Sequence, residues 1–121
     1  MIRTSSVYIS HMLICDLFSF HRYEFDPISV NVPRCTIEDL RGDDVDENVR
    51  EFRDVLRAGE YTNAKRDAVI LNAGFGVYVY GLTSSIEDGI ELARRTLYTG
   101  KASALLSQWA DVTTKIAASK I

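Results

Sequence analysis

The sequence feature that most constrains the fold is the stretch from Arg66 to Leu82, RDAVILNAGFGVYVYGL. From Ala68 to Leu82 it runs for fifteen residues, and only Asn72 interrupts its apolar character. Val77-Tyr78-Val79-Tyr80 has the β-branched and aromatic side chains that strands prefer. Such a length without a turn signal is long for a strand and fits a helix better. The residues alone leave both structures open and favour the helix.

The glycines of this stretch raise the question of whether it is a phosphate-binding loop. Gly74-x-Gly76 resembles the start of a dinucleotide fingerprint, but the third glycine is missing at the required offset and no short strand precedes it. We therefore do not expect a phosphate loop here. In a helix, Gly74, Gly76 and Gly81 would each cost about 1 kcal/mol relative to alanine. That cost is tolerable where another element packs closely against them.

The N-terminal part of the chain favours strands. Its apolar runs are short and lack a helical period, which predicts two strands at about Ser6–His11 and Leu13–Phe25, or one long bent strand. Asp26-Pro27 should end this region, because proline cannot donate to a strand ladder. Residues 28–36 are predicted to be an extended connector.

Helical signals dominate the rest of the chain. Thr36 to Asp39 looks like a capping box that opens one short helical turn. Asp44 should begin a helix whose apolar residues recur at helical spacing, namely Val45, Val49, Phe52 and Leu56. Ser84 to Glu87 looks like a second capping box, followed by a stripe of Ile86, Ile90, Ala93 and Leu97 that Gly100 closes. A last amphipathic helix should run from Lys101 and fray near Ala118.

Composition excludes several classes of function. The chain has 121 residues, a net charge of −3 and no dense basic run, so nucleic-acid binding is not expected. The apolar run is shorter than the roughly 20 residues that cross a membrane, and the N-terminus lacks a signal-peptide cleavage site. Cys15 and Cys35 form no CxxC motif, and His11 and His21 lack metal-ligand spacing. We expect two reduced thiols in a reducing compartment.

Five segments in order resemble one enzyme family. They are YEFDP at 23–27, VPRCTIEDLRGDD at 32–44, EN at 47–48, RDAVILNAG at 66–74 and SSIEDGIELARRTLYTGKA at 84–102. Together they look like the C-terminal part of anthranilate phosphoribosyltransferase. The resemblance covers about Tyr23 to Trp109, and only the last third or so of a complete family member. It implies that the stretch after Arg66 is a buried helix whose glycines and alanines are contact points.

The resemblance implies a mixed α/β fold class. We expect an N-terminal strand pair followed by three to four helices, as a partial piece of a larger α/β domain. Residues 23–121 would be the C-terminal part of the phosphoribosyltransferase domain. Residues 1–22 depart from the family and are either a divergent strand pair or non-homologous sequence; poor period-2 alternation favours the second reading. In a fragment, these strands would also be an unprotected edge.

The resemblance also implies a reaction. The family transfers a phosphoribosyl group from phosphoribosyl diphosphate to the amine of anthranilate, in tryptophan biosynthesis. It uses a glycine-rich loop to hold the diphosphate and magnesium to neutralise the leaving group. Neither that loop nor the paired Asp-Glu that holds the metal is found in this sequence. Asp46-Glu47 is out of order for the metal pair and is interpreted as helix N-terminal acid residues.

We therefore assign no catalytic, substrate-binding or metal residue and no bound cofactor to this chain. Magnesium, phosphoribosyl diphosphate and anthranilate would belong to the complete enzyme only. The first hypothesis is an enzyme fragment that is inactive without the missing N-terminal part, its partner. The alternative is a stand-alone, non-catalytic α/β protein-interaction module. The expected compartment is the cytoplasm, or the plastid stroma because the tail LLSQWADVTTKI resembles plant and algal members.

Overall fold

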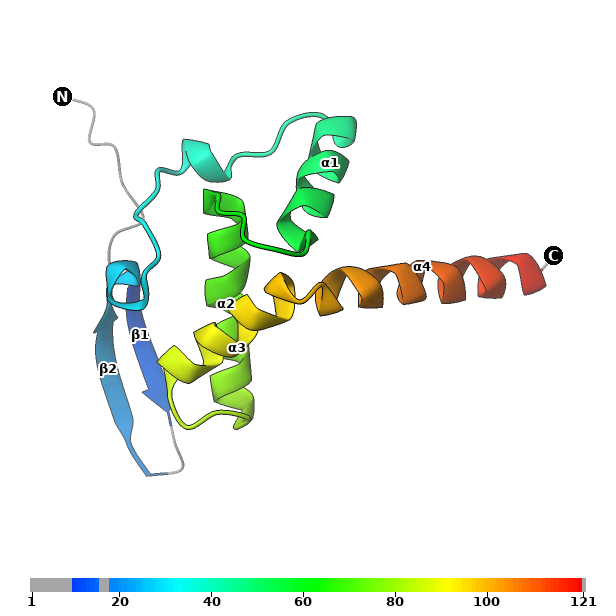
Figure 1. Cartoon of the computed structure of the whole chain (residues 1–121). Coiled ribbons are helices and arrows are strands. Elements are labelled where there is room, and N and C mark those ends of the chain that lie inside the picture. The colour runs from blue at the N-terminus through cyan, green and yellow to red at the C-terminus, as the bar shows by residue number, and fades with distance from the viewer. Residues whose placement is uncertain (1–9, 16–17, 121) are drawn as a thin grey trace. The chain divides into compact units, whose positions relative to one another are not determined.

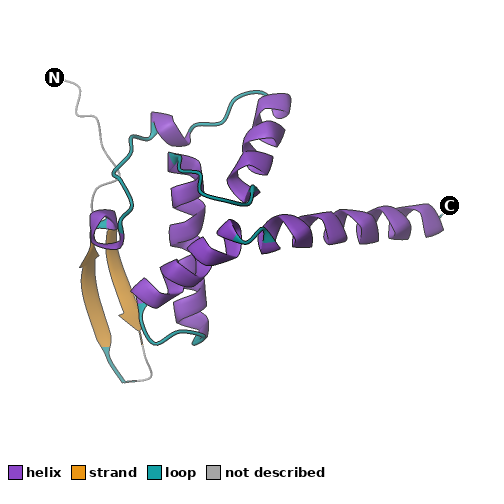
Figure 2. Cartoon of the chain, in the orientation of Figure 1, coloured by secondary structure: helices purple, strands orange, loops and turns teal. Residues whose placement is uncertain are grey.

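The computed structural model describes residues 10–15 and 18–120, and the chain divides into two units, one ending at Gly42 and one beginning at Asp43. The described elements are two strands, two short 3₁₀ helices and four α-helices, in that order (Figures 1 and 2). A strand pair followed by four helices confirms the predicted mixed α/β class.

The first unit begins with an antiparallel hairpin of β1 (Ser10–Cys15) and β2 (Phe20–Phe25). Ser10 pairs with Phe25 and Cys15 pairs with Phe20. The predicted strand bounds are wrong, because the chain reverses between Cys15 and Phe20 and not near Met12. No turn-forming residue stands at Met12, so pairing continues through it. Residues 6–9 of the predicted first strand lie outside the described residues.

β2 ends at Phe25, as Asp26-Pro27 predicts. The Asp26 carboxylate accepts the Ile28 N–H at 3.1 Å and opens η1 (Pro27–Val30). The prediction of an extended connector is therefore wrong over its first residues, because proline at the first helical position and an aspartate before it favour a helical turn. Phe25, Val30 and Val32 are buried.

The capping box at Thr36 is confirmed. The Asp39 carboxylate accepts the Thr36 N–H at 2.7 Å, and the Thr36 hydroxyl accepts the Asp39 N–H at 3.3 Å. These reciprocal bonds precede and open the single turn η2 (Glu38–Leu40). Hydrogen bonds from Thr36 lower the pKa of Asp39, so the box needs the ionised carboxylate.

The second unit consists of α1 (Val45–Leu56), α2 (Ala64–Tyr80), α3 (Ile86–Tyr98) and α4 (Lys101–Ser119). The first three helices begin at side-chain N-caps, Asp44, Asn63 and Ser85. Each cap accepts the N–H of the residue three positions on, which satisfies one of the unpaired donors of the first turn. The second capping box was predicted one residue too early, because Ser85 and not Ser84 is the cap.

The stretch that begins at Arg66 is helical as far as Tyr80, as the resemblance implies. α2 crosses α3 closely, since a Cβ on Gly74 would lie 2.5 to 2.7 Å from atoms of Ile90. The contact-point prediction is confirmed at Gly74. It fails in this structure at Gly76, which has open space, and at Gly81, which ends the helix with a φ of +89°. The helix is buried on one face only, because Tyr80 is 81% exposed.

α3 provides the centre of the second unit's core. Ile90 is 1% exposed, and Ala93 and Leu97 are also buried, which confirms most of the predicted stripe. The Gly59 N–H donates to the Tyr98 carbonyl at 2.9 Å. This bond ties the segment after α1 to the end of α3.

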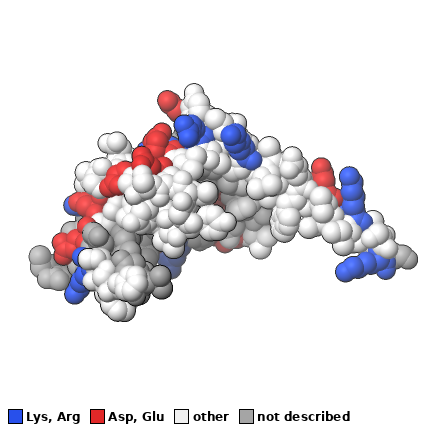
Figure 3. Space-filling view, turned by 90° about the horizontal axis from the view of Figure 1, so that it is seen from below, with Lys and Arg blue, Asp and Glu red and all other residues white. Residues whose placement is uncertain are grey.

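α4 confirms the predicted last helix, which runs from Lys101 to Ser119. It leaves the end of α3 at Gly100 and extends away from the α2–α3 crossing (Figure 1). None of its residues is buried. Figure 3 shows the helix as a largely uncharged surface until the charges near its C-terminal end.

Over the residues that the structure describes, none of the helices combines the length and the apolar character needed to cross a membrane.

Candidate functional site

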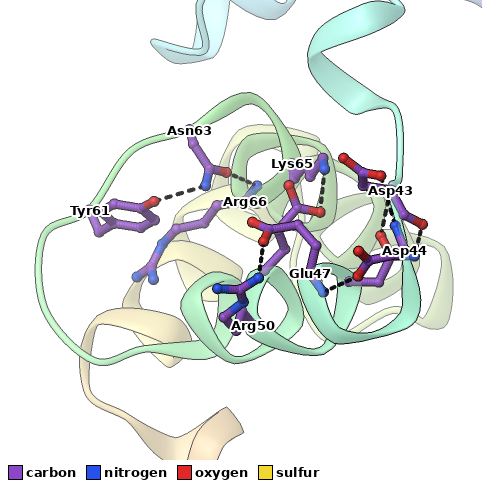
Figure 4. A network of polar contacts seen from close by, with 10 residues as sticks. Asp43, Asp44, Glu47, Arg50, Tyr61, Asn63, Lys65 and Arg66 are labelled. Carbon is purple, nitrogen blue, oxygen red and sulfur yellow. Dashed lines mark hydrogen bonds and ion pairs between the residues drawn. The ribbon is translucent and has the colours of Figure 1, made fainter.

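The most organised polar site of the second unit surrounds Arg66 in the first turn of α2 (Figure 4). Arg66 is 3% exposed. Its guanidinium donates to the carbonyl oxygens of Val55 at 3.1 Å, Arg57 at 2.6 Å and Gly59 at 3.0 Å. These are carbonyls at and just beyond the C-terminus of α1, which lack helical partners. Arg66 therefore caps α1 from the neighbouring helix.

The electrostatics of this site suit a permanent cation. The carbonyl end of a helix carries partial negative charge and attracts a positive group. Burial, and to a smaller degree the nearby Arg57, lower the pKa of Arg66. A guanidinium nevertheless stays protonated near neutral pH, since its ordinary pKa is far above it. Arg66 is thus a structural charge and not a proton-transfer group.

The segment between α1 and α2 is held by a second set of contacts. The Arg57 guanidinium lies 4.4 Å from the centre of the Tyr61 ring, a cation–π arrangement. The Asn63 amide donates to the Tyr61 hydroxyl at 3.2 Å, while its carbonyl oxygen accepts the Arg66 N–H at 2.7 Å. These contacts fix the segment's conformation.

One ion pair joins α1 to α2, and another lies within α1 (Figure 4). Lys65 at the start of α2 pairs with Glu51 of α1, and Glu47 pairs with Arg50 one turn along the same helix. The Asp44 carboxylate is the N-cap and accepts the Glu47 N–H at 2.9 Å. Asp46 and Glu47 lie in the first turn of α1, where the helix dipole favours negative charge, as the sequence predicts.

Asp67 follows Arg66 and is the one half-buried carboxylate of α2. Burial raises its pKa, and the guanidiniums of Arg94 and Arg66 oppose that rise. A raised carboxylate pKa is one mark of an acid–base catalyst. Arg66 and Arg94 are side chains of the packed helices, so the raised pKa of Asp67 does not by itself identify a catalytic group.

An apolar groove of about 310 Å³ lies among the four helices of the second unit. Its one polar lining residue is Thr96, whose hydroxyl donates to the Leu92 carbonyl at 2.8 Å. The groove therefore offers no free donor to a phosphate and suits an apolar group. It is lined by Leu56, Val69, Ile70, Ala73, Val77, Leu92, Ala93, Thr96, Leu97 and Ala102.

The described residues do not fit a magnesium site. Between residues 10 and 15 and from 18 to 120, no three His, Cys, Asp or Glu side chains lie together as ligands would. We accordingly derive no chemical step through a metal. The expectation that this chain carries no catalytic, substrate or metal residue stays a prediction.

Sequence reasoning missed the capping role of Arg66. Two signals could have indicated it: a cation three residues after the N-cap Asn63, where the helix dipole disfavours positive charge, and its place before an apolar run. A positive charge in the first turn of one helix is explained when it binds the carbonyl oxygens at the C-terminal end of another helix.

The family model described as "Glycosyl transferase family, a/b domain" matches residues 9–103. The chain is 40% identical over 95 residues to an anthranilate phosphoribosyltransferase of Rubrobacter xylanophilus, with 78% of this chain and 28% of the relative covered. It is 37% identical over 86 residues to one of Persephonella marina, with 71% and 25% covered. The matched region is the C-terminal part of these relatives, so the chain spans about a quarter of their length.

The fold matches a solved structure as well. The crystal structure of anthranilate phosphoribosyltransferase from Thermus thermophilus superposes with a TM-score of 0.71 at 32% identity. The superposition covers 85% of this chain and 31% of the Thermus chain.

Proposed function

Since the chain belongs to the glycosyl transferase family, a/b domain, we propose that it supplies the C-terminal part of an anthranilate phosphoribosyltransferase. The complete enzyme would transfer the phosphoribosyl group of phosphoribosyl diphosphate to anthranilate, for tryptophan biosynthesis. The observation that carries this proposal is the match of 85% of the chain to 31% of the Thermus structure.

In that enzyme, these residues act as scaffold. The α2–α3 crossing and the Arg66 cap form a small core of their own. The glycine-rich diphosphate loop and the metal-binding Asp-Glu pair would come from the missing N-terminal part, which is the proposed partner. Without them, the positioning and charge stabilisation that accelerate such a transfer are missing. The chain alone is therefore inactive, and magnesium belongs to the complete enzyme.

We propose that the β1–β2 hairpin is a divergent strand pair of this domain and not unrelated sequence. The family match begins at residue 9, before β1, and β1 pairs with β2 over its whole length. The outer edges of a two-stranded hairpin are available for further strands. The upstream part of the enzyme would supply those strands.

The proposed compartment is a reducing one, the cytoplasm or the plastid stroma. Two cysteines without a disulfide or metal motif fit such a compartment, and Cys35 is a thiol in the structure. The net charge of −3 gives no reason to propose a nucleic-acid partner.

A chimeric enzyme tests the proposal. Residues 9–103 of this chain replace the matched C-terminal segment of the Rubrobacter enzyme, and anthranilate consumption is followed with phosphoribosyl diphosphate and magnesium. We expect the chimera to turn over within about tenfold of its parent, since scaffold residues act on the rate only through positioning. The 121-residue chain alone should give no product.

Two results would overturn the proposal. A folded chimera without turnover would favour the stand-alone interaction module. Turnover by the chain alone would show that it holds an active site. A parent enzyme carrying its own segment through the same cloning junctions is the control.

A further inference from the structure

We draw no further inference here: the strongest candidate, the exposed apolar faces of α1 and α4 in the second unit, carries none, because the chain spans about a quarter of the length of its relatives and nothing in the structure shows what covers these faces.

Discussion

The helices α3 and α4 come from equally clear apolar patterns, yet they end in opposite environments. At the α2–α3 crossing, Gly74 lets α3 approach so closely that Ile90 is 1% exposed. In α4, no residue is buried and Trp109 is 64% exposed. Apolar residues that recur at helical spacing thus predict a helix and identify its apolar face. It does not say whether the partner of that face lies in the same chain.

The largest expected effect separates the two regions directly. Ile90→Ala should lower the free energy of unfolding by about 3–4 kcal/mol, because it leaves a cavity in a closely packed core. Ile116→Ala removes the same atoms from the surface of α4, where Ile116 is 51% exposed, and should cost less than about 0.5 kcal/mol. Urea unfolding measures both. Equal losses would mean that α4 is packed within the chain.

Two glycines of α2 sharpen the comparison. Gly74→Ala should destabilise the chain by about 2–3 kcal/mol, since its Cβ would clash with the Ile90 backbone and force the helices apart. Gly76→Ala meets open space and should stabilise by up to about 1 kcal/mol through helix propensity. The same unfolding assay distinguishes them, and a stabilising Gly74→Ala would refute the close crossing.

The Arg66 cap should matter less than the crossing. Arg66→Met keeps the side chain's length but leaves three carbonyls of the α1 end to be rehydrated, at a cost of about 2 kcal/mol. Arg57→Met, at an exposed residue, loses only its contact with Tyr61 and should cost about 0.5 kcal/mol. Thermal unfolding followed by circular dichroism compares the two, and similar small shifts would remove Arg66 from the account.

The smallest expected effect concerns the start of α3. Ser85→Ala should cost about 1 kcal/mol, because the hydroxyl accepts the Asp88 N–H at 3.1 Å. Ser84→Ala should be nearly neutral. The reverse order of the two midpoints in urea would restore the capping box that the sequence predicts at Ser84.

How much of the fold could be predicted from the sequence depends on how far apart in the chain the interacting residues lie. The start of α3 was predictable to within one residue, and the break between α3 and α4 was predictable at Gly100, because the serines before Ile86 and this glycine act on their immediate neighbours. The reversal of the hairpin was not, since β1 and β2 both consist of strand-forming residues and only their pairing sets where the turn falls. The helical state of α2 required the family resemblance, because its β-branched residues and glycines oppose its length.

The candidate site shows the same division. The acidic residues at the start of α1 were interpreted correctly from sequence, as local helix acids. The Arg66 cap depends on carbonyls that lie seven to eleven residues away in the sequence, and no local pattern specifies them. The apolar stripe of α1 was also predicted as one face, but no local pattern specifies that Val45 and Phe52 remain 76% and 54% exposed.

Hydrogen exchange of the 121-residue chain tests the central claim most directly, that α2 and α3 pack closely on each other while no residue of α4 is buried. We predict strong protection of the amides of residues 90–97. Amides of residues 105–116 should exchange much faster. Protection of residues 105–116 equal to that of α3 would contradict the account.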